Sequence, residues 1–167
     1  MGTGAGNMLN DLLALSHVPR WAIVPHAPPQ SVGDHVFRVM VIAVELAHRL
    51  RMPPLSQGAL IAILLHDADE SRTGDIPTPA KAKMATGEQV KYCPWMPEVE
   101  QFPQAHEREI VRLADLLEAA TFIHMYGVGP HAMLVARQLL LKITALPDPE
   151  CKAALGVYSS IVEERGR

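Results

Sequence analysis

Apolar residues recur at helical spacing through most of this chain, and glycines and prolines separate the apolar stretches. In the first stretch Leu9, Leu12 and Leu13 fall near one helical face, which predicts a short helix that ends near His17. The glycine-rich opening follows no strand, and its glycine spacing does not match a dinucleotide-binding loop. Residues 1–7 are therefore expected to form a flexible terminus.

Two longer apolar stretches follow a proline-rich loop. Ser31, with Asp34 three residues later, approximates a capping box and predicts a helix over residues 32–50. This stretch is rich in valine, but it lacks period-two alternation and is longer than a normal strand, so a helix is favoured. Ser56 can cap a third helix, whose apolar residues continue to Leu65.

The second half of the chain repeats the helical pattern after a proline-rich segment. Residues 76–103 are expected to form a flap with at most one short helix. Periodicity then predicts helices over residues 107–125 and 131–145, and a last helix that Asp148 caps, with Pro149 in its first position. Five or six helices without a convincing strand predict an all-α fold.

Composition narrows the classes of function. A chain of 167 residues has the typical length of a single domain, and no linker or internal repeat divides it. A net charge of -3 argues against a polyanion-binding surface, so nucleic acid is not expected as a partner. Cys93 and Cys151 are too few for a disulfide framework, and no stretch resembles a membrane span or signal peptide. We therefore expect a cytoplasmic protein that binds no membrane.

Candidate chemistry begins with His66 and Asp67, which directly follow the apolar run of residues 59–65. Burying an unpaired carboxylate costs several kcal/mol, so Asp67 must stay hydrated, be neutralised or find a cation. His35 and Asp115 lie in two further apolar helical stretches. Each residue alone is equally consistent with a solvated helix end. Together, two imidazoles and two carboxylates form a plausible ligand set for a divalent transition metal.

The order of these four residues, histidine, histidine-aspartate, aspartate, resembles the motif of the HD-domain metal-dependent phosphohydrolases. Arg20, Trp21 and Ile23 before the first histidine, and Thr73-Gly74-Asp75 after the pair, are similar to the 5′-deoxynucleotidase branch and its compact phage dATP triphosphohydrolases. The resemblance covers about residues 9–125 and implies a compact bundle of about five to seven helices. It also implies a bacterium or phage-infected bacterial host. The mixed imidazole and carboxylate donors suit cobalt, manganese, zinc or iron better than magnesium, and the sequence does not choose among these four.

Two further acids follow the histidine-aspartate pair. Glu70 would lie on the same side as Asp67 if the helix persists that far, and the resemblance implies that it activates water or protonates the leaving group. Glu70 could also bind a second cation, such as Mg²⁺ on the phosphates. Asp75 stands in a turn, where it can cap the bend through its side chain. The resemblance instead implies a catalytic role for Asp75 in the substrate site.

Five residues are candidates for substrate contacts. Arg20 offers forked donors for a phosphate, and Trp21 offers a rigid stacking surface for a base. The resemblance implies that Trp21 and Ile23 admit adenine and exclude 2-aminoadenine. Lys81 and Arg112 are candidate phosphate contacts, although solvated surface charge explains each of them equally well.

The resemblance implies a phosphohydrolase whose partner is a small deoxynucleotide. The favoured reaction is release of triphosphate from dATP, with 2-amino-dATP excluded. The alternatives are a 5′-deoxynucleotidase that releases phosphate from monophosphates, and a non-catalytic nucleotide-binding HD module. A ligand-free helical scaffold would require all the histidine and aspartate placements to be coincidental. Because similar proteins are dimers or higher assemblies, we expect a homo-oligomer, a dimer or a hexamer, with the apolar C-terminal helices as the candidate contact.

Overall fold

The computed structural model describes residues 5–77, 80 and 105–163 and contains helices without a strand in these ranges. The elements are, in order, α1 (Ala5–Ala14), the 3-10 helix η1 (Leu15–His17), α2 (Val32–Arg49), α3 (Gln57–Leu65), α4 (Glu70–Thr73), α7 (Ala105–Tyr126), α8 (Gly129–Thr144) and α9 (Glu150–Glu163). The only extended pairing in this part of the chain is two isolated antiparallel bridges. The prediction of an all-α fold is confirmed.

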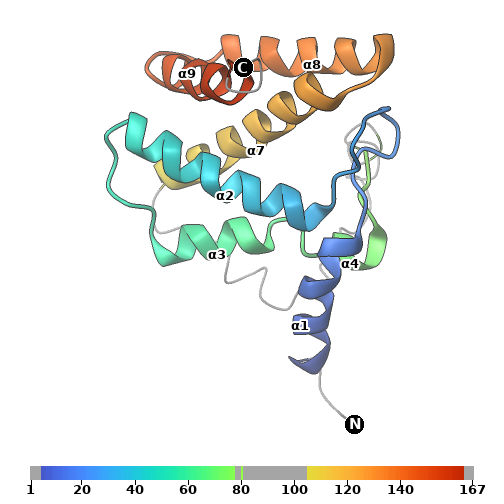
Figure 1. The fold of residues 1–167 in the computed structure, drawn as a ribbon. Helices are drawn as coiled ribbons and strands as arrows, with labels where there is room; N and C mark the ends of the chain where they lie inside the picture. The colour runs from blue at the N-terminus through green and yellow to red at the C-terminus, as the bar shows by residue number, and fades with distance from the viewer. Residues whose placement is uncertain (1–4, 78–79, 81–104, 164–167) are drawn as a thin grey trace.

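The long helices α2 and α7 pack against each other at the centre of the molecule (Figure 1). Helix α3 lies on one side of this pair, and α8 and α9 lie on the other. The main core cluster draws chiefly on α2, α7 and α9 and includes Val39, Ile42, Leu46, Ile63, Ile110, Leu113, Leu117, Ile143 and Val157. Side chains that α2 and α7 direct toward each other are therefore held in place by the packing of the core.

The start of α2 agrees with the sequence prediction. The Ser31 hydroxyl accepts a hydrogen bond from the Asp34 amide at 3.0 Å, and an Asp34 oxygen accepts the Ser31 amide at 3.2 Å. Because these bonds satisfy backbone donors at the helix end, the first turn is well defined. Gly33 lies in this turn, and a Cβ there would stand 3.1 Å from the Ser16 backbone, so glycine allows η1 to approach closely.

Helix α3 begins as predicted, with the Ser56 hydroxyl accepting the Ala59 amide at 3.2 Å. The buried Glu107 on α7 accepts the Ser56 amide at 2.8 Å, which attaches the start of α3 to α7. The helix ends at Leu65, so the condition that it persists to Glu70 is not met. Turns replace it over residues 66–69, and Glu70 begins the separate helix α4.

Two other boundaries differ from the predictions. Residues 5–7 belong to α1, so the expected flexible terminus is wrong for them. Helix α9 begins at Glu150, one residue after the predicted Pro149, and the Asp148 carboxylate pairs with Lys152 at 2.7 Å. Most of the predicted flap over 76–103 lies outside the described residues.

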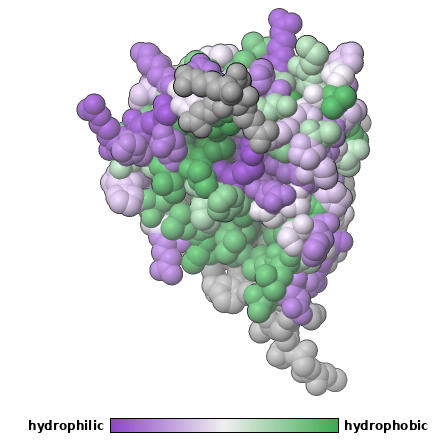
Figure 2. Space-filling view, in the orientation of Figure 1, coloured by the Kyte–Doolittle hydropathy of each residue, from purple (hydrophilic) through white to green (hydrophobic). Residues whose placement is uncertain are grey.

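Large apolar side chains are exposed on two faces of the molecule. One group covers the face of α2 and α3 seen in Figure 2 and contains Phe37, Val41, Val44, Ile61 and Leu64. The other group lies on α8 and contains Met133, Leu134 and Leu141. Exposed apolar surface is thus not confined to the C-terminal helices, where the sequence placed the subunit contact. No helix in the described part of the chain combines the length and apolarity that crossing a bilayer requires.

Candidate functional site

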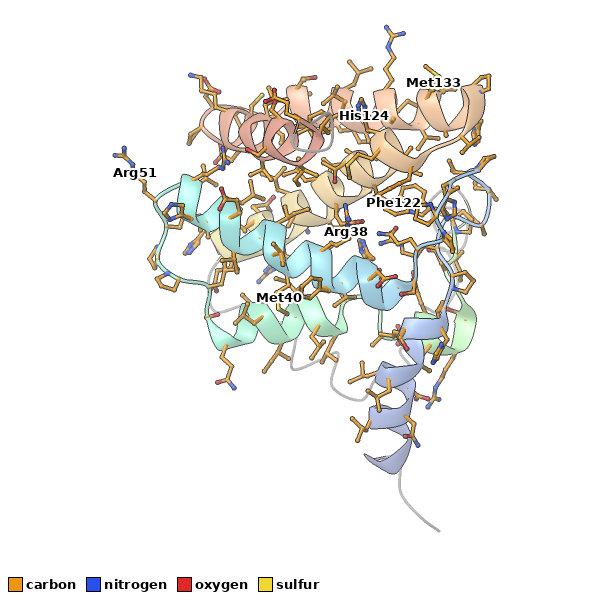
Figure 3. The ribbon with its side chains drawn as sticks, viewed as in Figure 1. Arg38, Met40, Arg51, Phe122, His124 and Met133 are labelled. Atoms are coloured by element: carbon orange, nitrogen blue, oxygen red, sulfur yellow. The ribbon has the colours of Figure 1, made fainter. Side chains whose placement is uncertain are left out.

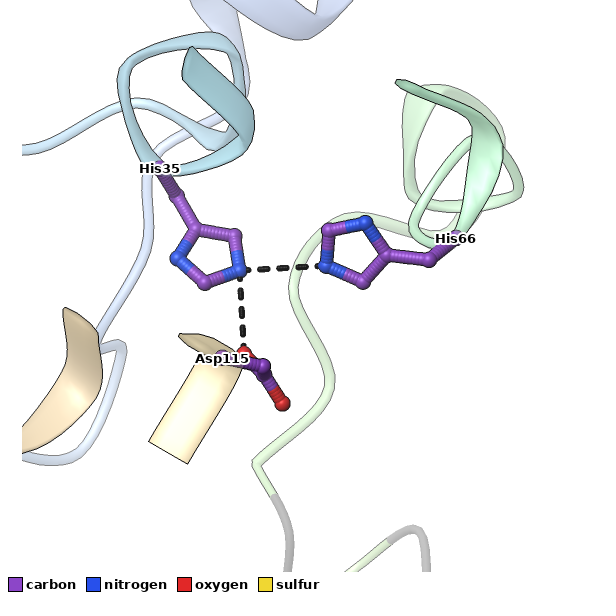
Figure 4. A group of neighbouring side chains, drawn as sticks. All are labelled: His35, His66 and Asp115. Carbon is purple, nitrogen blue, oxygen red and sulfur yellow. Dashed lines mark hydrogen bonds and ion pairs between the residues drawn. The ribbon is translucent and has the colours of Figure 1, made fainter. Parts of the chain in front are cut away.

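The structure brings four of the predicted site residues together, from α2, the turn after α3, and α7. Figure 4 shows three of them, His35, His66 and Asp115. His35 Nε2 lies 3.2 Å from His66 Nε2 and 3.2 Å from Asp115 Oδ1. Asp67 Oδ2 lies 3.5 Å from His35 Nε2 and 3.3 Å from His66 Nε2. Ligand atoms that share one ion, with bonds of about 2.1 Å, stand roughly 3.0–3.4 Å apart, so these spacings fit a metal-binding site.

The hydrogen bonds of both histidines place the proton of each neutral ring on Nδ1. His66 Nδ1 lies 2.7 Å from the Ile63 carbonyl oxygen, which can only accept, so Nδ1 carries the proton. His35 Nδ1 lies 2.6 Å from a carboxylate oxygen of Glu118 and donates to it in the same way. The ligand atoms of His35, His66 and Asp115 all lie within 4.8 Å of one another, and Asp67 lies beside the two histidines. When both rings are neutral, their Nε2 lone pairs face these carboxylates, and a proton or a metal ion can bind between them.

The charged groups of the site shift one another's pKa values, downward for the two carboxyls and upward for His66. Burial opposes ionisation of Asp67 and Asp115, but contacts and charges of the two histidines hold the pKa of each carboxyl below its ordinary value. Burial also opposes charging of His66, yet the hydrogen bond and charge of Asp67, helped by Asp115, raise its pKa to about 9. Without a metal, a proton on His66 is the cation that the site holds near neutral pH.

Metal uptake is therefore expected to displace a proton. Below the His66 pKa of about 9 the apparent metal affinity should rise about tenfold for each pH unit, and above it the affinity should level off. Chelator-buffered Zn²⁺ titrations at several pH values would measure this slope. An affinity that stays constant between about pH 7 and 9 would contradict the prediction.

The site opens to solvent on one side. His35 is completely buried, and the Asp67 side chain is 15% exposed, whereas the Asp115 side chain is 48% exposed. The cluster is therefore buried on the side of α2 and most exposed at Asp115.

The loop before α2 carries Trp21 next to this cluster. Trp21 has a positive φ of 65°, a conformation that costs energy for a residue other than glycine. Its amide donates to Asp75 Oδ2 at 2.8 Å, and its ring stacks on Phe122 of α7 with the centroids 6.2 Å apart. Asp75, which the sequence placed in the catalytic set, thus holds the backbone of the base-contact candidate; its catalytic role stays a prediction.

Sequence reasoning missed Glu118, a completely buried carboxylate on α7. Besides His35, it accepts a hydrogen bond from Arg38 Nε at 2.8 Å; Arg38 also lies over the Phe122 ring (Figure 3). Burial opposes its ionisation, but the His35 contact and the charges of Arg20 and Arg38 lower its pKa, so Glu118 is ionised. The available signal was an acid three residues after Asp115 in an apolar helix, where it shares a helical side with a ligand candidate.

The remaining candidates are less closely joined to the cluster. Arg20 is largely buried with Nη1 3.8 Å from Glu118, and its Nε and Nη1 have no hydrogen-bond partner among the described residues. Glu70 is buried, and Ile23 is 54% exposed. Arg112 is exposed and pairs with Glu109 at 3.1 Å, so the structure does not bring it into the cluster. Lys81 lies outside the described residues.

Comparisons with known proteins agree with this geometry. A family model described as an HD domain matches residues 13–93. The chain is 32% identical to a dATP triphosphohydrolase of Cyanophage S-2L over 133 residues, which cover 77% of this chain and 76% of that protein. It is 30% identical to a dATP triphosphohydrolase of Salmonella phage PMBT28, covering 73% of this chain and 69% of that protein.

A solved structure extends the likeness to the whole fold. The Cyanophage S-2L HD phosphohydrolase (DatZ), bound to dA and one catalytic Zn²⁺ ion, superposes with a TM-score of 0.77 at 26% identity. The match covers 98% of this chain and 99% of that one.

Proposed function

The chain belongs to the HD-domain phosphohydrolases, and from this membership we propose that it converts dATP and water to deoxyadenosine and triphosphate while rejecting 2-amino-dATP. The main support for this proposal is that hydrogen bonds connect the loop that contains Trp21 to the cluster of four candidate metal ligands. Gln30 bonds to Trp21 and to Glu118, and Glu118 bonds to His35. A nucleotide whose phosphates lie at the cluster could therefore have its base beside Trp21.

We assign His35, His66, Asp67 and Asp115 as the ligands of one divalent transition metal. Mixed imidazole and carboxylate donors suit zinc, cobalt, manganese or iron better than magnesium. When bound, such a metal would supply Lewis-acid polarisation of a phosphoryl oxygen and lower the pKa of a water molecule. Glu118 keeps the His35 ring in the tautomer that leaves Nε2 available.

Glu70 is assigned as the acid or base that handles the proton in hydrolysis. It follows Asp67 by three residues, and the Glu70 amide donates to the Asp67 carbonyl oxygen at 3.0 Å, so the turn keeps the two residues adjacent. Asp75 supports the site from the other side through its bond to the Trp21 amide. The unpartnered donors of Arg20 suit a phosphate oxygen. A second cation on the phosphates and a homo-oligomeric state remain part of the proposal.

Product analysis tests the proposed reaction. Purified protein would be incubated with Co²⁺, Mn²⁺ or Zn²⁺ and, separately, dATP, dAMP and 2-amino-dATP, and released triphosphate and phosphate would be resolved. We expect triphosphate from dATP alone. Phosphate from dAMP with dATP untouched would make the protein a 5′-deoxynucleotidase, and metal binding without turnover of any nucleotide would make it a binding module.

Replacing Ile23 by alanine tests the proposed base selectivity. Since Ile23 is 54% exposed, the fold should survive, and the space made should accept a 2-amino group. We expect kcat/KM for 2-amino-dATP to rise roughly 10- to 100-fold relative to dATP. Val41→Ala, at the same 54% exposure on α2, is the matched control. An unchanged ratio of the two substrates would remove Ile23 from the selectivity hypothesis.

A further inference from the structure

The buried carboxylate of Glu118 serves two parts of the site through its two oxygens. Oε2 lies 2.6 Å from Nδ1 of His35, and Oε1 accepts from Arg38 Nε at 2.8 Å and from Gln30 Nε2 at 2.7 Å. The Glu118 side chain thus contacts both His35, a candidate metal ligand, and Gln30 in the loop before α2. A carboxylate buried among three hydrogen-bond donors has a fixed orientation, because turning it would break at least one bond in a low-dielectric interior.

The amide of Gln30 links this carboxylate to the indole of Trp21. Gln30 is 3% exposed, and its Oε1 lies 2.7 Å from Trp21 Nε1. An indole N–H can only donate and an ionised carboxylate can only accept, so only one orientation of the amide satisfies both neighbours. Trp21 therefore donates a hydrogen bond to Gln30, and Gln30 donates one to Glu118, which also accepts from His35.

Other contacts hold Trp21 without a hydrogen bond to its indole nitrogen. Arg20 lies over the ring, 5.7 Å from its centroid, and also pairs with Glu118. The Asp75 carboxylate fixes the Trp21 backbone amide, and Phe122 supports the ring face. None of these contacts engages Nε1, the one polar atom of the ring, whereas the bond to Gln30 does. Gln30 is thus the hydrogen-bonded link between the indole edge and Glu118.

We infer that Gln30 and Glu118 are positioning residues that couple the orientation of the Trp21 indole to that of His35, so that base selection and metal binding share one buried carboxylate. As far as it concerns substrate selection, this inference rests on the proposed function. The coupling itself does not require a nucleotide. Because coupling between two sites is reciprocal, a metal held at His35 should be sensed at the indole.

The deciding experiment follows the indole ¹H–¹⁵N resonance of Trp21 during titration with Zn²⁺. The chain has two tryptophans, and comparison with Trp21→Phe assigns the signal. We expect Zn²⁺ to shift this resonance in the native protein and to shift it far less in Gln30→Met, which keeps the side-chain length but removes both hydrogen bonds. Gln138→Met, at an exposed position on α8, is the matched control and should behave as the native protein.

A second variant covers the case in which Gln30→Met does not fold. Glu118→Gln preserves shape but removes the charge that orients His35, and it should weaken Zn²⁺ binding about 10- to 100-fold. Gln30→Met should leave the Zn²⁺ affinity nearly unchanged, since Gln30 contacts Oε1 and His35 contacts Oε2. In Glu118→Gln the Zn²⁺-induced shift at Trp21 should also be lost.

The outcomes separate the inference from the proposed function. No shift at Trp21 in the native protein, or an equal shift in Gln30→Met, would overturn the coupling whether or not any nucleotide is hydrolysed. If dATP is hydrolysed, Gln30→Met should lower the discrimination against 2-amino-dATP about tenfold, and an unchanged ratio would overturn the selectivity role. If no nucleotide is hydrolysed, the proposed function fails while the titration still decides the coupling.

Discussion

Replacing His66 by alanine is expected to abolish stoichiometric metal binding and to slow dATP hydrolysis by roughly a thousandfold or more. Its Nε2 lies 3.2 Å from His35 Nε2 and 3.3 Å from Asp67 Oδ2, so the substitution removes one of the two nitrogens from the site. Activity is expected to fall so far because the two carboxylates and one imidazole that remain hold a metal poorly. Metal content by mass spectrometry and the rate of triphosphate release measure the two effects.

The His66→Ala variant should still fold. His66 follows the last residue of α3 and lies outside the apolar core clusters, and its only described hydrogen bond to the backbone is to Ile63 in the same helix. His48→Ala is the matched control, because His48 is exposed near the end of α2 and far in sequence from the cluster. Stoichiometric metal in His66→Ala, with hydrolysis within about tenfold of the native rate, would refute the ligand assignment.

Replacing Glu70 by glutamine is expected to lower kcat by about 10²- to 10⁴-fold while metal binding persists. The amide has nearly the same shape as the carboxyl, but it cannot give or take a proton at neutral pH. Glu70 is 4% exposed and begins α4, directly after the turn that carries the histidine-aspartate pair. Steady-state kinetics with dATP and a parallel Zn²⁺ titration distinguish loss of proton transfer from loss of the metal.

Glu45→Gln provides the comparison for this variant. Glu45 lies on α2 with its side chain 44% exposed and pairs with Arg49, so its loss should leave kcat unchanged. If Glu70→Gln lowers the melting temperature but keeps the native kcat, Glu70 is a structural acid and the assignment is wrong. Loss of Zn²⁺ binding in Glu70→Gln would instead place it among the metal-holding residues.

Some features depend only on interactions between near neighbours in the chain, and for these the sequence sufficed. Ser31 with Asp34, and Ser56 with Ala59, bond across three residues, so the helix starts could be predicted before any tertiary contact was known. The histidine-aspartate pair of the family motif is equally local, since His66 and Asp67 are adjacent. The local pattern did not decide whether α3 persists to Glu70, and the structure ends it at Leu65.

The meeting of the four ligand-type residues depends on how α2, α3 and α7 pack. Residue types and spacing identified His35, His66, Asp67 and Asp115 as a set, but only the packed helices set the separations of 3.2 to 3.5 Å between their ligand atoms. The exposure that opens the site on the Asp115 side is likewise a property of the packing.

The sequence by itself determined the all-α class, the starts of the second and third helices and the identity of the candidate metal ligands, because helical periodicity, capping and a short motif act within a few residues. Only the tertiary structure decided which polar groups surround those ligands. Glu118 meets His35 across 83 residues and Gln30 across 88, and Asp75 meets the Trp21 amide across 54. A buried polar group must find a partner wherever the fold brings one, and that requirement leaves no periodic trace along the chain.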